Sequence, residues 1–233
     1  MALSDAMQRR IETCARKYWA EHVSDTGFAE ITRGKEVGHR IADYVDDRTT
    51  SLLKINFDTR YEADPRGVIR KRSMGDVWIA DKSIFHPVNV KAGLQDMNGQ
   101  PNVVSMQKLL DYILNRWIDS YYLLIVKFVL DEPIGQKTVV VDLLEWLDFI
   151  TYDAGPGQIM LKERDFFAAI AEGHIPVKRT MAQKVECLFS RFEAGVESLA
   201  RNRERRLDRQ RTQFNGFDTA PFVVDQSGLL FVP

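Results

Sequence analysis

The segment RSMGDVWIADKSIFHPVNVKAG, which begins at residue 72, constrains the fold more than any other stretch of this chain. It predicts two short strands, at residues 76–80 and 88–92. In the second, apolar Val88 and Val90 alternate with polar Asn89 and Lys91. This is the period of a strand with one buried face, so Asn89 and Lys91 are expected to point the same way.

The first of these strands opens with a carboxylate, Asp76. If the two strands pair as an antiparallel hairpin around a turn at residues 81–87, Asp76 reaches the same edge as Asn89 and Lys91. An acid and an amide oxygen are hard ligands that suit Mg²⁺, which is usually held by one or two carboxylates plus water and phosphate oxygens. A lysine beside them offsets charge on a phosphate transition state. The trio therefore suits metal-assisted phosphodiester hydrolysis.

Asp76, a spacer and Asn89-Val90-Lys91 resemble the motif of the PD-(D/E)xK nucleases, the superfamily that contains most type II restriction endonucleases. The resemblance covers mainly residues 36–141. The chain departs from the motif twice: Gly75 precedes the acid where proline is usual, and Asn89 replaces the second acid, which removes one charge from the metal site.

The resemblance implies catalytic roles for Asp76, Asn89 and Lys91, with Mg²⁺ held by Asp76 and Asn89. In many enzymes of this superfamily the helix before the sheet supplies a further acid, and Glu36 matches that position. Glu62 and Asp64 are rival candidates for the remaining ligand. The competing interpretation is an ordinary hairpin with an exposed aspartate and a solvated lysine, since short motifs recur by chance.

The order of expected elements agrees with the motif. Helices are predicted at residues 4–22, 34–53, 105–119 and 180–213, and strands at 68–71, 76–80, 88–92, 121–130 and 137–143. We therefore expect an α/β fold with a restriction-endonuclease-like αβββαβ core, a mixed central sheet flanked by helices, and additional N- and C-terminal helices. The domain prediction is a single nuclease domain over residues 1–233, with its core at about 34–150 and a helical C-terminal extension at about 158–233.

Composition sets limits on the kind of protein. The chain has 233 residues, 45% hydrophobic and 28% charged, and a net charge of −1, so it has enough apolar content for one substantial core. The longest apolar run, which ends before Lys127, is far shorter than the roughly 20 residues that a membrane-spanning helix needs. These features predict a soluble, cytoplasmic protein without a membrane partner, and the resemblance to restriction endonucleases implies a prokaryotic one.

Bulk charge does not indicate a nucleic-acid partner, but basic residues are unevenly placed. Residues 201–211 contain six arginines and two acids, a local excess of +4. Polar side chains of the types that contact base edges and phosphates follow the second motif strand. The DNA-binding candidates are Gln95, Asn98, Gln100, Asn102, Arg70, Lys71, Arg72, Arg203, Arg205 and Arg206.

The sequence-based prediction is a Mg²⁺-dependent, sequence-specific endonuclease of double-stranded DNA, a type II restriction enzyme. The alternatives are a repair or junction-type nuclease of the same superfamily, and a non-catalytic DNA-binding protein that kept the fold. A palindromic site presents two scissile phosphates related by a two-fold axis, so a homodimer is the expected working form.

Overall fold

The computed structural model describes residues 2–31, 37–60, 74–94, 101–130 and 134–216, together with the short strands 223–224 and 230–231. The chain divides into two compact units, Met1–Glu193 and Ala194–Pro233. The first unit contains the five-stranded and three-stranded sheets and carries the predicted motif. None of the described helices has the length and hydropathy to cross a membrane.

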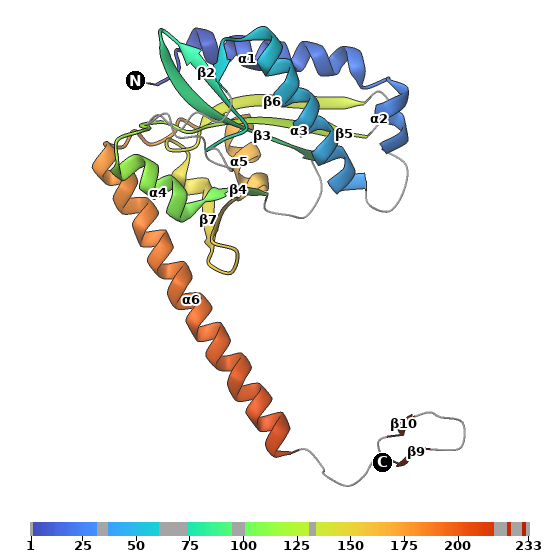
Figure 1. Cartoon of the computed structure of the whole chain (residues 1–233), viewed down its shortest axis with the longest axis vertical. Helices are drawn as coiled ribbons and strands as arrows, with labels where there is room; N and C mark the ends of the chain where they lie inside the picture. The colour runs from blue at the N-terminus through green and yellow to red at the C-terminus, as the bar shows by residue number, and fades with distance from the viewer. Residues whose placement is uncertain are drawn as a thin grey trace. The chain divides into compact units, whose positions relative to one another are not determined.

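A five-stranded mixed sheet lies at the centre of the first unit (Figure 1). Its strand order is β1-β2-β3-β5-β6. The β3 and β5 strands run parallel, and every other neighbouring pair is antiparallel. The strands are β1 (Thr59–Arg60), β2 (Val77–Asp81), β3 (Ile84–Leu94), β5 (Tyr122–Val129) and β6 (Gly135–Asp142). The expected α/β fold with a mixed central sheet is therefore confirmed.

Helices cover one face of this sheet. The α1 helix (Asp5–His22) packs on β6, and the α3 helix (Val37–Asn56) packs on β3; the short α2 helix (Thr26–Ile31) joins them (Figure 1). The Ser4 hydroxyl accepts a hydrogen bond from the Met7 N–H and so caps α1. Apolar residues of α1 and α3 form one core with alternate residues of β2, β3 and β5.

The opposite face of the sheet packs against the α4 helix (Met106–Leu114) and a smaller antiparallel sheet. That sheet has the order β4-β8-β7, with β4 at Asn102–Ser105, β8 at Gln158–Leu161 and β7 at Ile150–Asp153. The 3₁₀ helix η1 (Leu147–Phe149), the α5 helix (Glu163–Ala171) and the first turns of α6 (Met181–Asn215) complete this layer.

A buried ion pair connects the two layers. Lys127 of β5 and Glu163 at the start of α5 are only 4% and 8% exposed, and their side chains contact each other. Burial raises the pKa of the Glu163 carboxyl, and the Lys127 ammonium opposes that rise. The pairing explains how a lysine lies inside an otherwise apolar strand, because a buried charge requires a partner.

The second unit contains the later part of α6 and two short strands. The β9 strand (Val223–Val224) pairs antiparallel with β10 (Leu230–Phe231). The predicted helix at residues 180–213 is thus confirmed within two residues of its bounds.

Several predicted bounds were wrong. The hairpin turn is shorter than residues 81–87: β3 already begins at Ile84, and Lys82 and Ser83 adopt positive φ of 50° and 69°, as a tight two-residue turn requires. The α4 helix ends at Leu114 and does not reach residue 119. The β7 and β8 strands were not predicted. The predicted strand at residues 68–71 lies outside the described residues.

Candidate active site at the open edge of the central sheet

The candidate site lies where β3 extends beyond its neighbour β2. In the antiparallel register Val77 is opposite Val88, and the Asp76 N–H donates to the Val88 carbonyl oxygen at 2.9 Å. Beyond this point β2 has ended, whereas β3 continues to Leu94. Alternate N–H groups of that part of β3 therefore point away from β5 and need acceptors other than β2.

Asp76 supplies the first of these acceptors. Its Oδ2 atom accepts a hydrogen bond from the Val90 N–H at 2.7 Å. Burial raises the pKa of the Asp76 carboxyl, and the Val90 N–H and the nearby Lys91 ammonium oppose that rise. The fold therefore places Asp76 against the strand that carries Asn89 and Lys91, where the sequence predicted it.

Gly75 sets the direction in which the chain enters this site. Its φ is +82°, and a Cβ atom added there would lie 2.9 Å from the Val88 carbonyl oxygen. Proline fixes φ near −65°, so it cannot adopt this conformation. The departure of Gly75 from the proline of the usual motif thus has a steric reason in this chain.

Replacing Gly75 by alanine is expected to destabilise the fold by about 1–3 kcal/mol more than Gly157→Ala. Gly157 is a matched control, because its φ is +72° but a Cβ atom there would meet nothing within 4 Å. The control carries the cost of the positive φ alone, whereas Gly75→Ala adds the clash with Val88. Urea unfolding of both variants measures the difference, and equal losses would contradict this account.

The acid that α3 contributes is Asp46. The Ala92 N–H, two residues beyond the N–H that donates to Asp76, lies near the Asp46 carboxylate and favours its charged form. Burial raises the pKa of the Asp46 carboxyl to about 7; Lys91 opposes the rise, and the Asp76 carboxylate adds to it. Two carboxylates from different elements thus lie side by side along the open edge of β3.

Asn89 and Tyr121 form the buried wall of the site. The Asn89 side chain is 9% exposed, and its Nδ2 donates to the carbonyl oxygen of Val103 in β4 at 3.3 Å. This bond orients the amide so that Oδ1 faces the other way. The fully buried Tyr121 hydroxyl lies beside Asn89 but not in hydrogen-bonding geometry. Burial raises the pKa of Tyr121, and the Asp76 carboxylate adds to the rise.

Lys91 interacts electrostatically with both acids. Its ammonium lowers the pKa of Asp46 and of Asp76 against the larger effect of burial. Lys54 of α3 acts on Asp76 in the same direction. Positive charge is therefore present where two acids share one edge, as required if both are to be ionised together.

The residues present fit a divalent cation through two oxygen atoms. Asp46 Oδ1 and Asn89 Oδ1 are buried and accept no hydrogen bond from the residues that the structure describes. A buried acceptor without a donor is costly, and oxygens of this kind are the ligands that a hard cation prefers. Within the same residues no group of three or more His, Cys, Asp and Glu side chains is placed to hold a metal. The candidate ligands are thus two carboxylates and one amide oxygen.

The other predicted site residues fall into three groups by location. Glu36, Glu62, Asp64, Arg70, Lys71, Arg72, Gln95, Asn98 and Gln100 lie outside the described residues. Asn102 is exposed at the start of β4, next to the Val103 carbonyl that holds Asn89. Arg203, Arg205 and Arg206 are exposed on α6, in the second unit.

Sequence reasoning missed Asp46 and Tyr121. One signal for Asp46 was available, because it precedes the buried Leu53 by seven residues and so lies at the border of the apolar face of α3. An acid in that position is expected to be partly desolvated. Tyr121 carried no such signal, because it opens an apolar strand in which every side chain is expected to be buried.

Comparisons with known proteins do not place this chain in a family. No protein-family model matches the sequence, and no curated protein is significantly similar to it.

Proposed function

We propose that this protein is a Mg²⁺-dependent endonuclease of double-stranded DNA, of the PD-(D/E)xK kind and most like a type II restriction enzyme. The observation that carries the proposal is the gathering of Asp46, Asp76, Asn89 and Lys91 at the open edge of β3, with two buried oxygens that lack donors among the described residues. The proposal is further supported by the order of the surrounding elements, α3-β1-β2-β3-β4-α4-β5-β6, in which β4 belongs to the smaller sheet.

The metal would be held by Asp76, Asp46 and the Asn89 amide oxygen. In this assignment Asp46 takes the role that the resemblance gave to Glu36, since α3 presents Asp46 to the site. When bound, Mg²⁺ supplies a water of lowered pKa and draws charge from the phosphate oxygens. The two carboxylates would balance the charge of the ion, and water and the substrate phosphate would complete its coordination.

Lys91 acts on the reacting phosphate. Hydrolysis adds a water oxygen to phosphorus and breaks one P–O ester bond; the water loses a proton, and the leaving oxygen gains one. Negative charge builds on the phosphate oxygens as this happens, and the ammonium of Lys91 offsets that charge and orients the attacking water. Lys91 is kept beside the phosphate by the same two carboxylates that hold the metal.

Asn89 and its neighbours position the site. The Val103 carbonyl holds the Asn89 amide, and the neutral Tyr121 hydroxyl excludes water behind it. Asn102, next to Val103 at the start of β4, would contact the DNA groove or backbone close to the scissile bond.

Incubation of supercoiled plasmid and long linear DNA with the purified protein, with and without Mg²⁺, tests this function. Discrete Mg²⁺-dependent fragments support a restriction enzyme, and sequencing the fragment ends gives the recognised site. A smear indicates a nuclease without a sequence-specific site. Binding without cleavage across a panel of DNA substrates and divalent ions would overturn the enzymatic proposal in favour of a DNA-binding protein.

The arginines of α6 are proposed to contact phosphates. Replacing Arg203, Arg205 and Arg206 together by glutamine should reduce the slope of log affinity against log salt by about 0.9 for each phosphate that is no longer neutralised. Fluorescence anisotropy with a labelled duplex over a salt series measures the slope in the absence of Mg²⁺. Replacing Arg9, Arg164 and Lys178 in the first unit, which are likewise exposed, is the control for net charge. An equal change in both variants would remove the α6 arginines from the interface.

A further inference from the structure

The exposed large apolar side chains of α6 follow a regular spacing. They are Phe189, Val196, Leu207 and Phe214, which are 47%, 44%, 46% and 79% exposed. The steps between them are 7, 11 and 7 residues. Both steps are within about 20° of a whole number of helical turns, so the four side chains lie on one side of the helix. A line of large exposed apolar residues marks an interaction surface.

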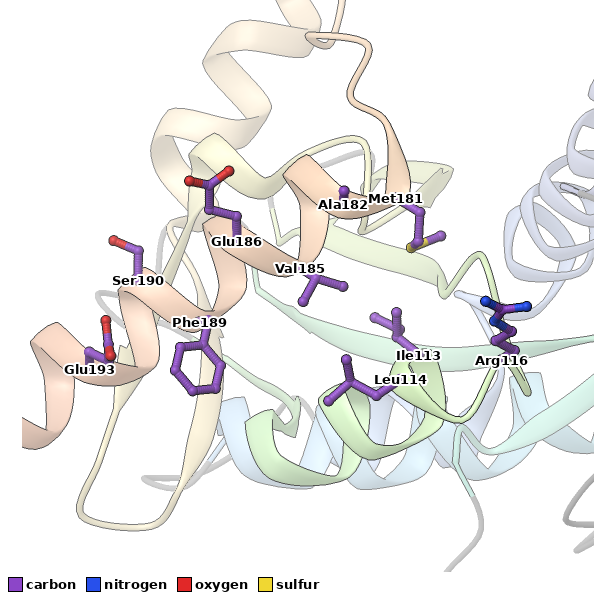
Figure 2. A pocket seen from close by; sticks show the side chains of 10 residues that line it. All are labelled: Ile113, Leu114, Arg116, Met181, Ala182, Val185, Glu186, Phe189, Ser190 and Glu193. Carbon is purple, nitrogen blue, oxygen red and sulfur yellow. The ribbon is translucent and has the colours of Figure 1, made fainter.

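An apolar groove of about 720 Å³ lies at the first of these residues. Figure 2 shows Val185 and Phe189 of α6 pointing toward Ile113 and Leu114 of α4, which form its opposite wall. Leu114 is 62% exposed, so the wall is open to an incoming side chain. Glu186 and Glu193 lie at the rim of the groove.

The spacing 7–11–7 is the same in both directions along the helix. Two antiparallel copies of α6 can therefore align all four residues at once, Phe189 against the partner's Phe214 and Val196 against the partner's Leu207. Such an interface is self-complementary about a two-fold axis, which is the commonest form of association between identical chains.

Charge selects the antiparallel arrangement over the parallel one. Residues 181–200 contain two basic and three acidic residues, a net −1, whereas residues 201–215 contain six arginines and two acids, a net +4. A parallel pair would place the two arginine-rich segments against each other. The antiparallel pair places each beside the acidic rim of the other copy, where Glu193 meets the partner's Arg211, and it also opposes the two helix dipoles.

We propose that this protein forms a two-fold homodimer through antiparallel pairing of α6, with Phe214 of the partner subunit seated in the groove between α4 and α6. The inference goes beyond the proposed nuclease activity and does not depend on it. It rests on the exposed apolar line, the palindromic spacing and the charge division of α6. Each dimer contains two such grooves and two copies of the candidate site.

Sedimentation or light scattering of the full chain, at tens of micromolar and without DNA or Mg²⁺, tests the association. The wild type is expected to be a dimer. Val196→Glu and Leu207→Glu each place a charge on the apolar line and should raise the dissociation constant by at least about tenfold. Ser198→Glu is the matched control, because nine residues from Phe189 place it on the opposite side of the helix, where it is exposed. It should leave the dimer intact.

Cysteine cross-linking tests the direction. Mixing the single variants Val196→Cys and Leu207→Cys under mild oxidation should give a covalent heterodimer, whereas each variant alone, and the wild type with Cys14 and Cys187, should not. A parallel pair would instead cross-link Val196→Cys to itself. Either that result or a monomeric wild type, including one whose groove holds the chain's own tail, would overturn the proposal.

Discussion

Asp76→Asn is expected to lower the rate of Mg²⁺-dependent DNA cleavage on the order of 1,000-fold, while DNA binding measured without metal stays within about twofold of the wild type. The asparagine keeps an oxygen that accepts the Val90 N–H, so the local backbone is retained, and only the charge is removed. The loss therefore reports the role of that charge in holding the metal, and not a failure of the fold.

The control for Asp76→Asn is Asp165→Asn, an exposed acid in the first turn of α5. Cleavage, DNA binding and thermal unfolding are measured for both variants. The control should cleave at the wild-type rate. Cleavage by Asp76→Asn at a rate close to the control would show that the site is elsewhere in the chain, and loss of thermal stability in Asp76→Asn alone would show that the lost activity is structural.

Asp46→Asn is expected to abolish cleavage and at the same time to stabilise the metal-free protein at pH 8. Burial raises the pKa of Asp46 to about 7 from an ordinary value of 3.8. The folded state therefore holds the proton more tightly than the unfolded state does. The stability that this group contributes falls as the pH rises from about 4 to about 7, and above pH 7 the full cost of the buried charge is present.

The asparagine variant removes that cost, so its unfolding temperature at pH 8 should exceed that of the wild type by a few degrees, since 1 kcal/mol corresponds to about 2–4 °C in a domain of this size. At pH 4, where the wild-type carboxyl is largely protonated in the fold, the difference should be close to zero. Differential scanning calorimetry in EDTA at both pH values measures it. A lower unfolding temperature at pH 8 would mean that Asp46 is a structural ion-pair partner.

Metal binding should reverse the difference in unfolding temperature between the wild type and Asp46→Asn at pH 8. Because an ionised Asp46 is needed to hold Mg²⁺, added Mg²⁺ should raise the unfolding temperature of the wild type at pH 8, have a smaller effect at pH 5.5, and have almost none on Asp46→Asn at either pH. Cleavage at limiting Mg²⁺ should rise with pH through about 7, and higher Mg²⁺ should move the rise to lower pH. A pH-independent metal response would exclude Asp46 as a ligand.

The hairpin that carries the motif was predictable because its signals are local. Gly75 and Asp76 before an apolar run, and the alternation of Val88 to Lys91, specify two strands and the faces of their side chains within a few residues. The bounds of the hairpin were less predictable. Pro87 suggested a longer turn, yet it lies inside β3, since the paired strands tolerate it opposite Trp78.

Asp46 could not be assigned from the sequence, for a different reason. An acid on α3 is one of several, with Asp43 and Asp47 close by, and a place at the border of the apolar face does not by itself show which of them reaches the sheet. The choice depends on how α3 sits on β3, and packing of the Ile41, Val45 and Leu53 side chains against the sheet determines that position. That position brings the Asp46 carboxylate near the Ala92 N–H and the Asp76 carboxylate.

The amino-acid sequence by itself determined the β2–β3 hairpin, the β5 and β6 strands, the α1, α3, α4 and α6 helices and the motif residues Asp76, Asn89 and Lys91, because strand alternation and helical spacing act over a few neighbouring residues. The tertiary structure alone decided which groups meet: Asp46 with the edge of β3, Tyr121 with Asn89, and Lys127 with Glu163. These pairs are separated by tens of residues, and the free energy that brings them together comes from the apolar cores on either side of the sheet and not from the polar groups themselves.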